Sequence, residues 1–274
     1  MLTSRPMLSI QCSGLNTRYI APWGLPSSSD DQLVLLVHGA GGSSCHWEPM
    51  LKAWFAMPME PGLFPVAIDL PGHGASEGTV LPSIADIAAF LDAFLDALGI
   101  TNPVCYVGHS AGGLLGIQFA LSYPHRVDRL VLMATSAQIQ LHPDFLQQAL
   151  TGDWDYASLQ QSFAPDIAEN LKQLVLNEFQ HLRLASEAAD FMDLNQADLR
   201  AALPTLPMPA LVVTGDDDVI ISPRKSKLLQ RALPNASLVT LPGAGHYVHV
   251  EQAATVAATL AHFLQQSRSA VCPV

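Results

Sequence analysis

Short apolar runs alternate with segments of helical periodicity along this chain, and that alternation constrains its fold more than any other feature. The runs LVLLV (33–37), PVCYV (103–107) and ALVVT (210–214) are apolar at nearly every position, as strands buried on both faces must be. Such strands form parallel sheets, which need crossover helices between them. Eight strands are predicted, at residues 7–12, 16–21, 33–37, 65–69, 103–107, 129–134, 210–214 and 237–241.

Helical segments occur where this arrangement needs crossovers. In residues 82–98 apolar side chains recur every third or fourth position, and Gly99 directly after them suits a helix end. Helices are also predicted over residues 112–122 and 251–265. The alternation predicts a doubly wound α/β fold with a mostly parallel, eight-stranded sheet.

Residues 138–203 interrupt the alternation, because they contain helical patterns and no convincing strand. The segment is too large for a simple loop, and we expect a helical cap inserted between strands 6 and 7 that covers a site. Residues 1–137 and 204–274 would form the core, and the cap would not be an independent domain. The helical patterns lie at about 143–151, 155–163, 166–182 and 186–202.

Charge and hydropathy narrow the expected partners and location. The chain has 24 acidic and 13 basic residues among 274, a formal net charge of −11. An acidic chain without a Lys/Arg cluster is a poor candidate for binding nucleic acid or an anionic membrane. The first dozen residues lack the apolar core of a signal peptide, and no run approaches the roughly 18 apolar residues of a membrane span. We expect a cytoplasmic protein, and the sequence does not indicate its oligomeric state.

The segment VGHSAGG (107–113) follows a buried strand and precedes a helix. This is the pattern G-x-S-x-G, in which a sharp strand-to-helix turn exposes a serine hydroxyl and requires small residues on both sides. Backbone N–H groups at the helix start, among them that of Ala111, can stabilise negative charge there. The pattern predicts that Ser110 is a nucleophile.

A serine hydroxyl needs a base to become a nucleophile. Of the ten histidines, His246 follows the last strand on a glycine-rich loop and precedes the final helix, at the sheet edge where Ser110 is expected. We therefore predict His246 as the base and keep His249 as a weaker candidate. We expect His38 and His73 to brace loops and His109 to make a structural hydrogen bond.

The base needs an acid to orient it, and the reaction needs an oxyanion hole. Three consecutive aspartates, Asp216, Asp217 and Asp218, follow strand 210–214, and the residues alone do not decide between them. The loop HGAGG after strand 33–37 offers the N–H of Ala40 as a second oxyanion donor beside that of Ala111. Its glycines match neither of the two common phosphate-binding patterns.

Five motifs occur along the chain in the order HGAGGSS (38–44), DLPGHGASEG (69–78), GHSAGG (108–113), PALVVTGDDDVIISP (209–223) and LPGAGHYVHVEQ (241–252). With these motifs the chain resembles the α/β-hydrolase superfamily, and within it the serine hydrolases with a helical cap and a carboxylesterase-like site. The order Ser…Asp…His is that of the family. The resemblance implies Asp218, the third residue after Gly215, as the acid, with Asp217 in reserve.

The resemblance also implies a function. We expect a catalytic triad of Ser110, His246 and Asp218, with an oxyanion hole at Ala40 and Ala111, that cleaves esters of small, fairly apolar substrates through an acyl-enzyme. No metal and no cofactor are expected, and the partner would be a small-molecule ester or a related acyl compound. A carbon–carbon bond hydrolase, a lactonase or a thioesterase with the same triad, or a slow-turnover ligand sensor, remain as alternatives.

Overall fold

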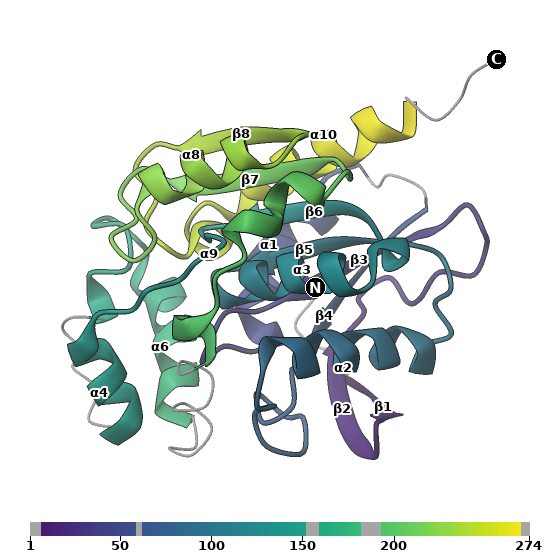
Figure 1. Ribbon diagram of the computed structural model, residues 1–274, viewed down its shortest axis with the longest axis horizontal. Coiled ribbons are helices and arrows are strands. Elements are labelled where there is room, and N and C mark those ends of the chain that lie inside the picture. Colours follow the sequence, from purple (N-terminus) through teal and green to yellow (C-terminus); the bar gives the residue numbers. More distant parts are fainter. Residues whose placement is uncertain (1–6, 59–61, 152–158, 182–192, 270–274) are drawn as a thin grey trace.

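A computed structural model describes residues 7–58, 62–151, 159–181 and 193–269 of the chain (Figure 1). Its eight strands form one sheet in the order β1-β2-β4-β3-β5-β6-β7-β8. Pairing is antiparallel between β1 and β2 and between β2 and β4, and parallel everywhere else. The strands are β1 (Leu8–Cys12), β2 (Leu15–Ile20), β3 (Gln32–Val37), β4 (Leu63–Ile68), β5 (Val104–His109), β6 (Val127–Met133), β7 (Ala210–Gly215) and β8 (Ala236–Leu241).

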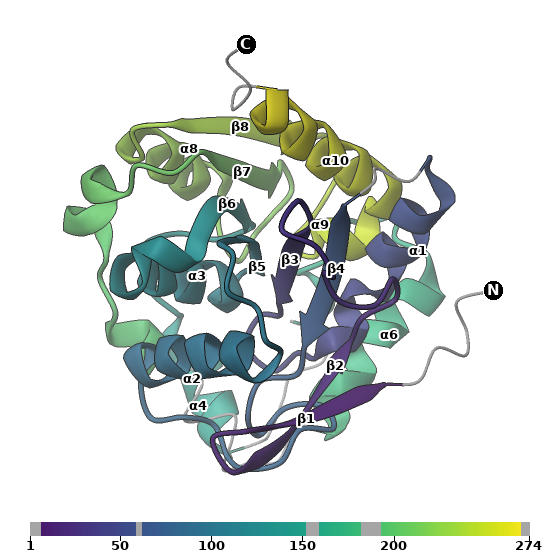
Figure 2. The ribbon, with the colours of Figure 1, turned by 90° about the vertical axis from the view of Figure 1, so that its right-hand side faces the viewer.

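Helices cover both faces of this sheet, as a doubly wound fold requires. Figure 2 shows α2 (Ile84–Ala97), α3 (Ala111–Ser122) and α8 (Pro223–Ala232) on one face. On the other face lie α1 (Glu48–Ala56) and α10 (Ala253–Ser269), the latter preceded by the short α9 (Val248–Glu251). The prediction of a mostly parallel, doubly wound sheet is confirmed.

Side-chain alternation along the central strand β5 separates two apolar cores. Tyr106 packs with α2 and α3 in one core, whereas Cys105 and Val107 pack with α1 and α10 in the other. All six residues of β5 are buried, which is why the sequence is apolar at successive positions rather than at every second one. The carboxyl end of β5 is thereby held rigidly at the sheet edge where Ser110 follows.

Residues 138–203 connect strand β6 to strand β7 and are here called the β6–β7 insertion. Its described residues contain α4 (Pro143–Thr151), α6 (Glu169–His181) and most of the 3₁₀ helix η3 (Arg200–Thr205), and no strand. The predicted helices at 155–163 and 186–202 fall partly outside the described residues. Two further 3₁₀ turns, η1 (Ser44–Trp47) and η2 (Pro124–Arg126), lie in the core. No helix in the described part of the chain combines the length and apolarity that crossing a bilayer requires.

Candidate active site

Ser110 stands at the sharp turn between β5 and α3. Its backbone is at φ 53° and ψ −119°, a region that non-glycine residues rarely adopt and that needs support from its surroundings. A Cβ atom at Gly108 would overlap the backbone of Gly112, and one at Gly112 would overlap the carbonyl oxygens of Val37 and His38. The two glycines therefore allow the strained turn, as the sequence pattern predicted.

The loop after β3 passes directly beside this turn. A Cβ atom at Gly39 would lie 3.1 Å from the Cβ of Ser110, so the glycine allows the loop to approach the serine closely. Among the described residues, no acceptor receives a hydrogen bond from the backbone N–H of Ala40 or of Ala111. These are the two N–H groups that the sequence analysis predicts for an oxyanion hole.

His246 and Asp218 form a buried hydrogen-bonded pair. Nδ1 of His246 lies 2.9 Å from Oδ2 of Asp218, and both side chains are almost fully buried. The other carboxylate oxygen, Oδ1, accepts the backbone N–H groups of Ile220 at 2.9 Å and of Ile221 at 2.8 Å. Because a carboxylate only accepts, Nδ1 carries the proton, and Nε2 of the neutral ring holds the lone pair that a base needs.

The neighbouring aspartates do not share this environment. Asp216 is exposed, and its Oδ1 accepts the N–H of Gly243 at 2.6 Å. Asp217 is also exposed, and within the described residues its carboxylate makes no hydrogen bond or ion pair. Of the three predicted candidates, the structure brings only Asp218 to His246.

The backbone of His246 is tied to the turn that carries Ser110. Its carbonyl oxygen accepts a hydrogen bond from Nε2 of His109 at 3.0 Å, and the two rings have centroids 4.9 Å apart. His109 therefore has the structural role predicted for it. Among the described residues, no hydrogen bond joins Oγ of Ser110 to Nε2 of His246, and contacts between nucleophile and base are often looser before substrate binds.

His249, the weaker candidate base, lies away from Asp218 in a fully buried position. Its ring packs 4.4 Å from the rings of both Trp47 and His109. In the described structure neither of its ring nitrogens has a hydrogen-bond partner, and the same is true of Nε2 of His46. Burial lowers the pKa of His46 to about 4 and holds the pKa values of His109 and His249 well below their usual range.

His38 and His73 brace loops, as predicted. Nδ1 of His38 donates to the carbonyl of Gly39 at 2.8 Å, while Nε2 accepts the N–H of Leu70 at 3.2 Å. Nδ1 of His73 lies 3.1 Å from the carbonyl of Pro71. Within the described part of the chain, no group of three or more His, Cys, Asp and Glu side chains is arranged to hold a metal ion.

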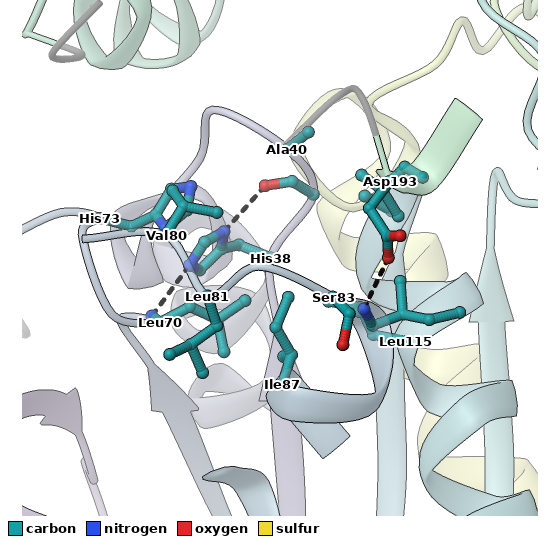
Figure 3. A pocket seen from close by; sticks show the side chains of 14 residues that line it. His38, Ala40, Leu70, His73, Val80, Leu81, Ser83, Ile87, Leu115 and Asp193 are labelled. Carbon is teal, nitrogen blue, oxygen red and sulfur yellow. Dashed lines mark hydrogen bonds between the residues drawn. The ribbon is translucent and has the colours of Figure 1, made fainter. Parts of the chain in front are cut away.

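Ala40 and Ala111 are among the residues that line a small pocket, which Figure 3 shows from close by. Its only carboxylate in the described structure is that of Asp193, whose Oδ2 accepts the N–H of Ile84 at the start of α2 at 2.8 Å. This contact joins the β6–β7 insertion to the core. Most of the lining is aliphatic and comes from Ala40, Leu70, Val80, Leu81, Ile84, Ile87, Ala111, Leu115 and Leu194.

Comparison with known proteins shows the family to which the chain belongs. Residues 34–259 match the model of the alpha/beta hydrolase family. The chain is 31% identical over 252 residues to the Variovorax paradoxus protein named "Putative carbamate hydrolase RutD", covering 86% of this chain and 92% of that one. It is 30% identical over 250 residues to a pimeloyl-(acyl-carrier protein) methyl ester esterase of Neisseria meningitidis serogroup C, covering 85% and 93% of the two chains.

The fold has a close counterpart among solved structures. The enol-lactonase from Burkholderia xenovorans LB400 superposes with a TM-score of 0.81 at 23% identity, covering 94% of this chain and all of the other. A likeness at this identity concerns the fold. With the family match over most of its length, this chain belongs to the α/β-hydrolase family.

Proposed function

We propose that the protein is a serine hydrolase that cleaves carboxylic esters of small, uncharged and fairly apolar substrates through an acyl-enzyme. The observation that carries the proposal is the buried pair of His246 and Asp218, held through His109 against the strained turn of Ser110. Both relatives described above have names that denote hydrolases, and one of them is named as an ester-cleaving enzyme.

In the first half of the reaction, Oγ of Ser110 attacks the acyl carbon while Nε2 of His246 takes its proton. Asp218 keeps the proton of the neutral imidazole on Nδ1 and stabilises the imidazolium that forms. His246 then gives the proton to the leaving alcohol. In the second half, water attacks the acyl-enzyme by the reverse of this route and releases the acid.

The negative charge of each tetrahedral intermediate needs donors that are already in position. Ala111 directly follows Ser110, and Ala40 follows Gly39, which approaches Ser110 closely. Among the described residues, the N–H groups of Ala40 and Ala111 donate to no protein acceptor. Ala111 is also the first residue of α3, so the positive end of the helix dipole adds to the stabilisation. We assign these two groups as the oxyanion hole.

We further infer that the β6–β7 insertion is a helical cap on a core formed by residues 1–137 and 204–274. Leu159 and Phe163 of the insertion pack with Tyr247 beside the base, and Ala40 borders the same cluster. Leu194 packs with Ala111. A cap that contributes aliphatic side chains to both sides of the site favours an uncharged substrate, because a charged group would lose its hydration there.

The assignment of the nucleophile is tested by Ser110→Ala. We expect hydrolysis of p-nitrophenyl acetate to fall by at least about 10⁴-fold, because alanine has no hydroxyl on which the acyl-enzyme could form. Ser122→Ala at the exposed end of α3 is the matched control and should keep its rate. Circular dichroism checks that both variants fold. Retention of most of the activity in Ser110→Ala would refute the proposal, and lactones and thioesters in the same panel would show which acyl bond is preferred.

A further inference from the structure

Glu251 is the last residue of α9, and its carboxylate accepts three backbone hydrogen bonds. Oε2 accepts the N–H of Gly245 at 2.7 Å and that of Ala164 at 2.9 Å. Oε1 accepts the N–H of Tyr247 at 2.9 Å. Hydrogen bonds to an ionised carboxylate are stronger than those between neutral groups, so this half-buried side chain fixes the positions of three backbone N–H groups.

Two of these amides belong to the residues on either side of His246. The N–H of His246 itself donates to the carbonyl of Ser162 at 2.7 Å, and its carbonyl accepts from His109. Three consecutive N–H groups therefore have fixed acceptors, two of them on Glu251. With the backbone held on both sides, the position of the His246 Cβ is fixed, and from that position Nδ1 of the ring reaches Asp218.

The third amide comes from the β6–β7 insertion. The stretch Ser162–Ala164 passes close to residues 245–247, here called the histidine loop because they carry His246. A Cβ at Gly245 would lie only 2.6 Å from the carbonyl oxygen of Ser162. The ring of Phe163 stacks on that of Tyr247, with centroids 4.9 Å apart and planes inclined by 22°. This stretch of the insertion and the histidine loop thus pack as one unit, with Glu251 bonded to both.

We propose that Glu251 is a positioning residue whose carboxylate holds the His246 loop and the Ser162–Ala164 stretch in the one arrangement that presents the base. The inference rests on the proposed function, since it assigns His246 as the base. A carboxylate suits the role because it offers two acceptor oxygens and no donor. A glutamine amide would turn one N–H donor toward another and lose at least one of the three bonds.

The test is the variant Glu251→Gln, with Glu251→Ala beside it. We expect kcat for p-nitrophenyl acetate to fall about 10- to 100-fold in Glu251→Gln, because small displacements of a catalytic group are costly. KM should stay within about twofold, since Glu251 does not line the pocket described above. Glu251→Ala should lose more than Glu251→Gln, which keeps one acceptor oxygen. Glu48→Gln is the matched control, because Glu48 pairs at the surface with Lys52, and it should keep wild-type kinetics.

A second readout does not depend on turnover. The proton on Nδ1 of His246 should give a downfield NMR resonance, assigned by its loss in Asp218→Asn, and this resonance should broaden in Glu251→Gln but not in Glu48→Gln. A wild-type protein that hydrolyses no ester would contradict the proposed function, while the resonance would still decide the role of Glu251. Glu251→Asp, which keeps the charge with a shorter reach, should show the same kinetic split. Wild-type kcat and a sharp resonance in either the Gln or the Asp variant would overturn the inference.

Discussion

Asp218 differs from its two neighbours in what its carboxylate contacts, although all three follow the same strand. One oxygen receives Nδ1 of His246 and the other receives two backbone N–H groups. The site at Asp218 is thus a small loop folded around a buried charge. Asp217 is exposed on the outside of that loop.

This contrast gives a matched pair of substitutions. Asp218→Asn should lower kcat by about 10⁴-fold with the fold intact, because an amide can leave the proton on the wrong nitrogen of the histidine. Asp217→Asn removes the same charge one residue earlier and should stay within about twofold of the wild type. Steady-state hydrolysis of p-nitrophenyl acetate measures both. Equal losses in the two variants would show that the charge of the loop matters and the contact does not.

At the residue scale, the sequence pointed to positions where chemistry demands a particular residue type. Gly108, Gly112 and Ser110 form a pattern whose geometry is nearly fixed by sterics, and the structure has that geometry. Glu251 was not predicted, because its role depends on amides from residues 245, 247 and 164 that only the folded chain brings together. A glutamate five residues after a histidine has no distinctive signal of its own.

At the scale of elements, apolar runs predicted all eight strands, with ends that differ from the observed ones by two residues or fewer. Helices α1 and α8 were not predicted. Helix α8 begins PRKSKLL and has few apolar residues, and only Ser226 and Leu229 of it are buried. Its hydrophobic stripe is too narrow to stand out in sequence, and packing against the sheet decides its conformation instead.

The end of α2 is joined to the turn η2 by Arg126, which the sequence also did not reveal. The guanidinium donates to Asp92 at 2.6 Å, to Asp96 and to the carbonyl of Ile100 at 2.9 Å. Its side chain is only 10% exposed, whereas that of Asp96 is 64% exposed. Most of the stabilisation therefore comes from the contacts with Asp92 and Ile100, since exposed ion pairs contribute little.

Removing this side chain should cost stability and leave the proposed chemistry unchanged. Arg126→Ala should lower the free energy of unfolding by about 2 kcal/mol, because a partly buried carboxylate and a carbonyl lose their donor. The site lies at the opposite end of β5, some 20 Å away for six residues of strand, so kcat should not change. Urea denaturation measures the loss. Arg231→Ala, at the exposed end of α8, is the control and should shift stability by less than about 0.5 kcal/mol.

On the scale of the whole molecule, three buried histidines come from three different elements, namely η1, the end of β5 and α9. His46, His109 and His249 are each nearly or fully buried, and each has at least one ring nitrogen without a hydrogen-bond partner in the described structure. No carboxylate bonds to any of the three among these residues. The native state therefore has to keep them neutral, and its stability depends on pH for that reason.

The direction of this pH dependence follows from the lowered pKa values of the three histidines. Above about pH 6.5 the three histidines are neutral in both the folded and the unfolded chain, so they add no pH dependence. Below that pH the unfolded chain binds protons that the folded chain refuses, and stability falls. Each histidine can lower the free energy of unfolding by up to about 1.4 kcal/mol per pH unit, so the three together can lower it by up to about 4 kcal/mol per pH unit. For His46 the loss stops near pH 4, where its folded form is protonated too.

Because native domains are stable by only about 5–15 kcal/mol, we expect cooperative acid unfolding between about pH 6 and pH 4. The urea midpoint should be constant from pH 8 to pH 7 and then fall steeply. His249→Leu removes one of the three buried groups that bind a proton on unfolding, and it removes no hydrogen bond, so its urea midpoint should fall less steeply with decreasing pH. His142→Leu, at a 75% exposed side chain, should follow the wild type. If His249→Leu and the wild type lost stability in parallel down to pH 5, protonation of the buried histidines would not be what limits the fold in acid.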